Sequence, residues 1–438
     1  MAARGASSPV FLWLGVLVAV LVLAIVTPAL LNRPVRVGSP AAPVVIDWVF
    51  AERNPAFLAF YDGAIAEFEA SHPGVRIRYR YVAKFTQRLP TMIASPKRPH
   101  IIYSQGGEML FRMYRGGVIR DITPEMQRDG WEGQFPRTAV DTYRVKGRIV
   151  GVPQHVAMND FYYNRRLFRQ AGIDAGRIRT WNDLLAAVRA LQGLGVAPIA
   201  AGPLEPWSVG IYLNLFAMRT CGREDLRAAI ERRERGFVAP CFVRAAGMLT
   251  ELTRKGAFQP GVAATDYAQS MGLFADGRAA MVLSFSGTTV SDQQRNASDA
   301  KGLSPDDIGT FPMPEVEDGL GQRTDTYGGI AGWAVLAGAP DEAVAFVRFL
   351  TSPEKQRQLA ALNLQVPIDA NAAAAVQDRL LRRSALQFRD STWHQVYVED
   401  EMGAAVGKVL LTVAAGLIGG GLEPEDAAQR VQKVVDTE

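Results

Sequence analysis

Histidines, which often carry protons or bind metals in enzymes, are few in this sequence and far apart. The 438 residues include only His72, His100, His155 and His394. No H-E-x-x-H, G-x-S-x-G, P-loop or G-x-G-x-x-G pattern is present. We therefore expect no catalytic residue, no metal site and no cofactor, and we predict that the chain is not an enzyme.

The two cysteines, Cys221 and Cys241, have a spacing that suits a disulfide bond. Such a bond would close a loop of about 20 residues and contribute roughly 3 kcal/mol to stability in the chain-entropy model. Disulfides persist mainly in oxidising compartments, so we predict this one for an exported protein. Two buried free thiols are the alternative. A metal site is not expected, because no histidine stands nearby.

The N-terminal residues 1–32 contain an almost purely apolar run, Val10 to Val26, which Arg4 precedes. This pattern is typical of a secretory signal or an N-terminal membrane anchor. Small residues permit a cut after Ala29, and no cysteine follows that could carry a lipid. The segment predicts a periplasmic protein, which an uncleaved helix would hold at the inner membrane. Residues 33–43 are predicted to form a linker.

The length of the chain suits two medium-sized domains rather than one. The formal net charge is only +4, and the arginines are scattered rather than clustered. These features exclude an extended basic surface of the kind that nucleic acids bind.

Strands and helices are predicted to alternate through most of the chain. Val44–Phe50 is a continuous apolar strand, and Asn54 followed by Pro55 marks the start of a helix. Thr180 to Asp183 resembles a capping box before another helix. This alternation predicts an α/β fold with parallel-rich sheets covered by helices.

Three stretches in the same order resemble the family 1 extracellular solute-binding proteins. Residues 147–184 are similar to the family's run G-x-x-Y-G-x-P, Y-Y-N-x-x-x-F-x-x-A-G and T-W-x-E-L. Residues 271–283 are similar to F-x-x-G-x-A-A-M. Residues 308–353 are similar to G-x-x-P-x-P, G-G-x-x-x-x-I and A-x-x-F-x-x-F-L-x-S-P-E. The resemblance extends over residues 44–435.

The resemblance implies a two-lobed, type II periplasmic-binding-protein-like fold with the ligand in the cleft between the lobes. We expect residues 44–155 with 310–352 in the first lobe, and 156–309 with 353–438 in the second. The implied protein is a monomeric substrate-binding component of an ABC importer, which delivers a sugar or polyol to permease subunits. A glycerol phosphodiester or a polyamine as ligand, or an anchored sensory or assembly lobe, are the alternatives.

Glu205 and Trp207 are the first candidates for ligand contact, because Leu204 to Trp207 resembles the family's Glu-Pro-aromatic cleft loop. A carboxylate accepts sugar hydroxyls, and an aromatic ring stacks on the apolar side of a pyranose. Trp207 tucked into the core is the alternative. Ser104 and Gln105 follow a strand, where doubly wound folds place ligand loops.

Further candidates lie at the ends of other predicted strands. Phe50 and Glu52 end the first strand, and Ser286 and Gly287 follow the F-x-x-G-x-A-A-M strand. The family commonly has a stacking tryptophan near Gly287, so its absence argues against a maltodextrin-like site. A last predicted cleft loop contains glycines that would let the backbone approach the ligand. Its residues are Tyr327, Gly328 and Gly329.

Overall fold

The computed structural model describes residues 38, 40, 42–50, 54–83, 85–232 and 236–438. The predicted export segment, residues 1–32, and most of the linker 33–43 lie outside the described residues. Within the described part of the chain, no helix combines the length and the apolar character needed to cross a membrane.

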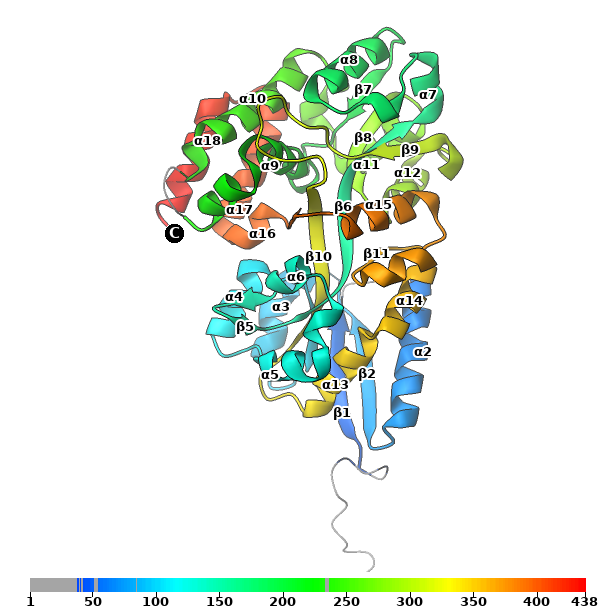
Figure 1. The fold of residues 1–438 in the computed structure, drawn as a ribbon, viewed down its shortest axis with the longest axis vertical. Helices are drawn as coiled ribbons and strands as arrows, with labels where there is room; N and C mark the ends of the chain where they lie inside the picture. The colour runs from blue at the N-terminus through cyan, green and yellow to red at the C-terminus, as the bar shows by residue number, and fades with distance from the viewer. Residues whose placement is uncertain (1–37, 39, 41, 51–53, 84, 233–235) are drawn as a thin grey trace, which may run out of the picture.

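The chain forms two lobes, which lie one above the other in Figure 1. The strands β6 (Val152–Asn164) and β10 (Thr326–Val335) cross from one lobe to the other. The helix α15 (Arg379–Arg389) lies beside these crossing strands. The first lobe contains β1 (Val44–Phe50), α2 (Pro55–Ser71), β2 (Val75–Tyr81), α3 (Phe85–Ala94), β3 (Ile101–Ser104), α4 (Gly107–Arg115), α5 (Thr123–Gln127), α6 (Arg137–Asp141), β4 (Arg144–Val145), β5 (Arg148–Ile149), α13 (Asp341–Leu350), α14 (Pro353–Ala361) and β11 (Val366–Pro367). The second lobe contains α7 (Arg165–Gln170), α8 (Trp181–Gln192), β7 (Ala197–Ala200), α9 (Trp207–Ile230), α10 (Pro240–Arg254), α11 (Tyr267–Ala275), β8 (Ala279–Phe285), α12 (Thr289–Asn296), β9 (Ile308–Phe311), β12 (His394–Gln395), α16 (Val398–Met402), α17 (Ala404–Ile418) and α18 (Pro424–Val435).

A single mixed sheet passes through both lobes in the order β2-β1-β3-β10-β6-β8-β7. Within the lobes, β1 pairs in parallel with β2 and β3, and β7 pairs in parallel with β8. The crossing strands β6 and β10 pair antiparallel with each other and with β8 and β3. The predicted α/β fold is confirmed: β1 to β3 in the first lobe and β7 and β8 in the second are parallel, and the crossing strands bring antiparallel pairs into the same sheet.

Local signals in the sequence position the helices as expected. The side chain of Asn54 accepts a hydrogen bond from the N–H of Ala56 and caps α2. Thr180 and Asp183 form a capping box at the start of α8. Both contacts satisfy backbone N–H groups that a helix leaves unpaired in its first turn.

Two large hydrophobic cores and a smaller third cluster are formed by the described residues, and the two large cores place some segments differently from the predicted ranges. Phe311, Met313 and Val316 belong to the second core, because β9 pairs with β6 in the second lobe. Residues 310–327 therefore lie with the second lobe rather than the first. Leu359 and Val366 belong to the first core, since β11 pairs with β6 in the first lobe. Residues 353–376 therefore lie with the first lobe.

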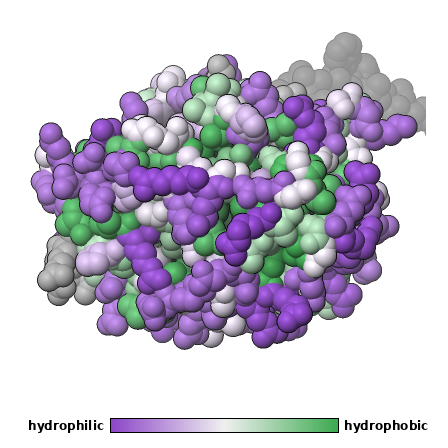
Figure 2. Space-filling view, turned by 90° about the horizontal axis from the view of Figure 1, so that it is seen from above, coloured by the Kyte–Doolittle hydropathy of each residue, from purple (hydrophilic) through white to green (hydrophobic). Residues whose placement is uncertain are grey.

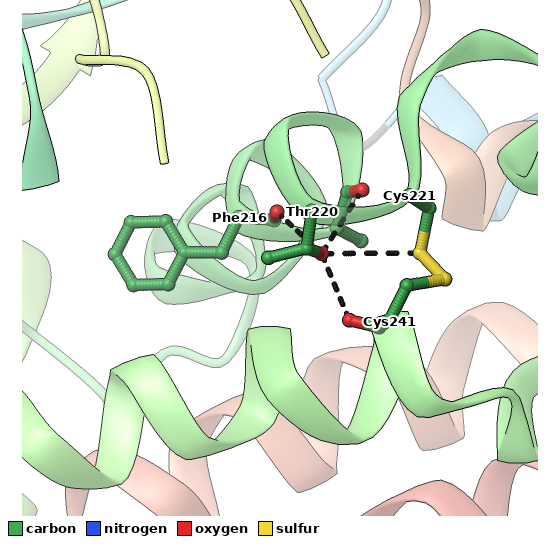
Figure 3. The surroundings of a disulfide bond; sticks show 5 residues. Phe216, Thr220, Cys221 and Cys241 are labelled. Atoms are coloured by element: carbon green, nitrogen blue, oxygen red, sulfur yellow. Dashed lines mark hydrogen bonds between the residues drawn. A yellow bond between two sulfur atoms is a disulfide. The ribbon is translucent and has the colours of Figure 1, made fainter. Parts of the chain in front are cut away.

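Cys221 and Cys241 form the predicted disulfide, with an S–S distance of 2.10 Å. Figure 3 shows it beside Thr220, whose hydroxyl donates to the carbonyl oxygens of Phe216 and Cys241. The bond joins α9 to the first turn of α10.

The end face of the second lobe is mainly hydrophilic. Figure 2 views this face from above and shows hydrophobic residues in smaller areas among the hydrophilic ones. This distribution is typical of a protein surface in contact with water.

Candidate functional site

One face of the crossing strands runs from the first lobe to the second. Directly opposed residues on paired strands point to the same face, and so do residues two apart on one strand. From the first lobe to the second, the residues of this hinge face are Tyr103, Trp333, Ala331, His155, Gly329, Ala157, Asn159 and Phe285.

A cavity of about 180 Å³ lies at the first-lobe end of the hinge face, by the carboxyl ends of β1 and β3. We call it the first-lobe cavity. Aromatic rings make most of its wall. The described lining residues are Phe50, Phe57, Tyr61, Tyr103, His155, Trp333 and Gln365. None of them is charged at neutral pH, since burial lowers the pKa of His155 to about 3.

Several buried polar atoms around this cavity have no hydrogen-bond partner among the described residues. They are Nε1 of Trp333, Nδ1 of His155 and Oε1 of Gln365. Further along the hinge face, the side-chain amide of Asn159 is unpaired at both its nitrogen and its oxygen. A buried polar group left unpaired costs about 1–3 kcal/mol, so a ligand that pairs with these atoms would gain free energy. The arrangement fits a polar, uncharged ligand.

An aromatic cluster in the second lobe lies beside the other end of the hinge face. Trp207, the first residue of α9, remains 43% exposed. Its ring centroid lies 4.8 Å from that of Tyr267 and 5.9 Å from that of Phe285. The hydroxyl of Tyr267 donates to Asp292 at 2.8 Å, which holds this ring in place. The cluster offers an exposed apolar surface backed by fixed rings.

The cavity and the aromatic cluster approach each other at Gly287. A Cβ atom there would lie 2.1 Å from the carbonyl oxygen of Leu364 and 3.5 Å from Cα of Gln365. Gly287 also has a φ of +84°, which L side chains rarely adopt. Only glycine permits this contact between the lobes, and this explains why no tryptophan occupies the position.

Carboxylates of α16 lie next to the second-lobe end of the hinge face. Tyr397 packs over Gly329, and its ring centroid lies 5.5 Å from that of Tyr327. The amide of Asn214 donates to the hydroxyl of Tyr327 at 3.0 Å and to Glu399 at 2.7 Å. Burial, together with the charge of Asp400, raises the pKa of Glu399 to about 7.

The same helix touches the first lobe. A Cβ atom at Gly107 of α4 would lie 2.7 Å from the carbonyl oxygen of Asp400. Burial, reinforced by the charge of Glu401, raises the pKa of Asp400 to about 6. The lobes therefore meet on both sides of the hinge strands, at Gly287 and at Asp400.

The predicted second-lobe contacts occupy different environments. Glu205 is exposed, and its carboxylate accepts the N–H of Tyr267 at 3.0 Å at the start of α11. Trp207 belongs to the aromatic cluster and is not buried in the core. The hydroxyl of Ser286 accepts the N–H of Met158 at 2.9 Å, so this side chain fastens β8 to β6.

Some of the predicted first-lobe contact residues are buried and make contacts within the fold. Ser104 is buried, and its hydroxyl accepts the N–H of Gly106 at 3.1 Å. Gln105 is exposed beside it. Phe50 is fully buried and lines the first-lobe cavity. Glu52 lies outside the described residues.

The prediction of a cleft loop at residues 327–329 is wrong, because these residues belong to strand β10. Tyr327, Gly328 and Gly329 are buried in the sheet rather than free at its edge. A Cβ atom at Gly328 would lie 1.9 Å from the carbonyl oxygen of Ala157, so the glycine serves close strand packing. The glycine pair indicates a tight hinge, which the sequence pattern alone did not separate from a loop.

Sequence reasoning missed His155, Asn159, Tyr267, Phe285 and Gln365. One signal was available for the first two. Both belong to a group of polar residues, with Gln154 and Asp160, inside the buried strand 152–164, which makes the strand unusual for a buried one. Nothing in the local pattern marks Gln365, which reaches the site only through the folding of the chain.

Two α/β lobes, a hinge of crossing strands and a cavity whose described lining is largely aromatic and uncharged define a two-lobed binding protein. The chain belongs to the family described as bacterial extracellular solute-binding proteins, whose model matches residues 52–357. An uncharacterized ABC transporter extracellular-binding protein of Pyrococcus horikoshii is 22% identical over 361 residues, covering 80% of this chain and 77% of the relative.

Two further comparisons concern proteins with named ligands. The sn-glycerol-3-phosphate-binding periplasmic protein of Shigella flexneri is 25% identical over 307 residues, covering 64% of this chain and 68% of the relative. The structure of a chitin oligosaccharide binding protein matches with a TM-score of 0.75 at 23% identity, covering 90% of this chain and 98% of that one.

Proposed function

We propose that this protein is the substrate-binding component of an ABC importer and captures a neutral sugar or polyol between its lobes. The observation that carries the proposal is the first-lobe cavity, whose described lining residues are uncharged and include buried, unpaired atoms of Trp333, His155 and Gln365. Sugars present hydroxyl groups to such atoms and an apolar ring face to aromatic side chains. Trp207 supplies an exposed ring on the opposite lobe.

A phosphorylated polyol is the second candidate, because one relative is named as a glycerol-3-phosphate-binding protein. Phosphate groups in proteins are held by arginine, lysine or helix N-termini. No arginine or lysine lines the first-lobe cavity among the described residues, and the buried His155 is neutral at pH 7. A polyamine would need carboxylates there, and the described lining has none. These facts favour the uncharged ligand.

The proposal includes export and delivery. Residues 1–32 are the predicted export segment, and the Cys221–Cys241 disulfide suits an oxidising compartment. The partners are permease subunits in the membrane, which would take the ligand from a monomeric binding protein. A retained N-terminal anchor stays a prediction from the apolar run alone.

A thermal-shift screen of the protein from residue 43 onward tests the class of ligand. The panel is galactose, xylobiose, chitobiose, raffinose, sn-glycerol 3-phosphate and spermidine. A ligand that binds only the native state raises the melting temperature by mass action, so we expect a shift with at least one neutral sugar. A shift with glycerol 3-phosphate or spermidine alone would contradict the proposal.

Trp207→Ala tests the second-lobe contribution to the same site. We expect affinity for the stabilising sugar to fall roughly tenfold by calorimetry, since an aromatic stacking contact is worth about 0.5–1.5 kcal/mol beyond area burial. Trp207→Phe keeps a ring and should retain most of the affinity. Leu204→Ala, which removes another exposed apolar side chain of the same loop, is the matched control and should bind normally.

A further inference from the structure

Gln365 lies where the first-lobe cavity meets the second lobe. Its side chain lines the cavity together with His155 and Trp333. Its Oε1 is shielded from water and accepts no hydrogen bond from the described residues. The residue stands between α14 and β11, so its backbone is part of the first lobe.

The backbone around Gln365 is also a contact surface for the second lobe. Cα of Gln365 and the carbonyl oxygen of Leu364 lie against Gly287, at a separation that leaves no room for a Cβ atom. Gly287 directly follows Ser286, whose N–H donates to the carbonyl oxygen of Met158 at 2.7 Å. The contact is thus tied to the hinge strand β6.

Phe285, two residues before Gly287, belongs to the aromatic cluster with Trp207. A continuous set of contacts therefore runs from the cavity through Gln365 and Gly287 to the exposed ring of the second lobe. A ligand that orders Gln365 would order a surface on which the second lobe closes.

We propose that Gln365 senses the ligand: it accepts a hydrogen bond from a sugar hydroxyl in the first-lobe cavity and so holds the lobes closed through Gly287. The inference rests on the proposed function and names the residue that links binding to closure. Without a sugar, the amide oxygen of Gln365 is buried and unpaired, which disfavours the closed arrangement. A sugar O–H pairs this oxygen and removes that penalty only while the lobes are together. Ligand binding and closure are thereby coupled.

Two substitutions test this coupling: one removes the hydrogen bond of Gln365, and the other disturbs the contact at Gly287. The probe is the neutral sugar that stabilises the wild-type protein most in the thermal-shift panel. Gln365→Met keeps the length of the side chain and removes its hydrogen bonds. We expect the affinity for the sugar to fall roughly fivefold, the value of one neutral hydrogen bond. Gln377→Met, the same change at an exposed glutamine twelve residues along the chain, should leave the affinity unchanged.

Gly287→Ala pushes the lobes apart, because its Cβ atom meets the backbone of Leu364. Gly195→Ala is the matched control: its φ of +72° imposes the same backbone strain, but no atom lies within 4 Å of the added Cβ. We expect Gly287→Ala to weaken sugar binding and Gly195→Ala to leave it unchanged. Melting temperatures of all variants establish that each is folded.

The double variant decides between coupling and independent effects. If Gln365 acts through Gly287, the double variant binds the sugar no more weakly than Gly287→Ala alone. Additive losses, or wild-type affinity in Gln365→Met, overturn the inference while leaving the proposed function intact. Failure of every neutral sugar to bind the wild-type protein overturns both.

Discussion

Glu399 is a carboxylate in an environment that disfavours its charge. Its carboxylate accepts a hydrogen bond from Asn214, it stands beside Asp400, and burial raises its pKa to about 7. Below its ordinary pKa the group is protonated in both the folded and the unfolded chain. As the pH rises toward 7 the unfolded chain ionises first, so the folded state loses stability through this interval.

Glu399→Gln should therefore stabilise the protein in a pH-dependent way. The glutamine oxygen still accepts from Asn214, and the buried charge is gone. We expect equal free energies of unfolding at pH 4, and an advantage of about 1–3 kcal/mol for the variant at pH 8. Urea denaturation at both pH values measures this difference. Glu425→Gln, at an exposed position of α18, should show no such divergence. Parallel pH curves for Glu399→Gln and the wild type would refute the assignment.

Helix α9 shows how one element serves both the core and the site. Its first residue, Trp207, belongs to the aromatic cluster, and it is interrupted at Gly222, where φ is +67°. One turn earlier the guanidinium of Arg219 donates to the carbonyl oxygens of Met313 and Asp325 at 3.2 and 3.1 Å. These bonds hold the connection that leads into hinge strand β10.

The disulfide lies at this interruption and should matter for stability. Replacing both Cys221 and Cys241 by serine should lower the free energy of unfolding by roughly 3 kcal/mol, because the unfolded chain regains the freedom of its closed loop. Urea denaturation with and without reductant measures the effect. Reductant should destabilise the wild-type protein and leave the double variant unchanged. A wild-type protein that is indifferent to reductant, with two thiols open to alkylation, would mean that the bond does not form.

At the scale of the whole molecule, the two large cores are joined by only a few described elements, chiefly the crossing strands β6 and β10, so hinge bending is available to the lobes. Two sets of close contacts join the lobes: Gly287 against Leu364, and Gly107 against Asp400. The first-lobe cavity and the aromatic cluster lie in different lobes, so the proposed ligand would contact both lobes only when they are together.

Saturation with the sugar that binds should therefore make the molecule more compact. We expect the radius of gyration from solution scattering to fall, because sugar hydroxyls exchange water for partners from both lobes only in the closed form. The fluorescence of Trp207 should change at the same sugar concentration, and Trp207→Phe identifies that contribution. Saturation without any change in scattering would show that the site works without closure.

The sequence alone determined the features that depend on neighbours along the chain. The strand Val44–Phe50, the cap at Asn54 and the capping box at Thr180 arise from local hydrogen bonds and the periodicity of apolar residues. Ordered motifs over three stretches identified the family, and the spacing of two cysteines predicted the disulfide. These signals depend on residues close together in the sequence, so they can be interpreted without knowing the tertiary structure.

Only the tertiary structure decided which residues line the first-lobe cavity. His155 and Gln365 are 210 positions apart in the chain and line one cavity because β11 pairs with β6. Whether Tyr327 to Gly329 form a loop or a hinge strand depended on pairing with β12 at Tyr327 and with β6 at the two glycines, which no local propensity encodes. Position 287 must be a glycine because the backbone of Leu364, in the other lobe, leaves no room for a Cβ atom. Which residues lie on the same face of the sheet, and which residues of the two lobes touch, depends on strand register. The packing of the whole molecule sets that register.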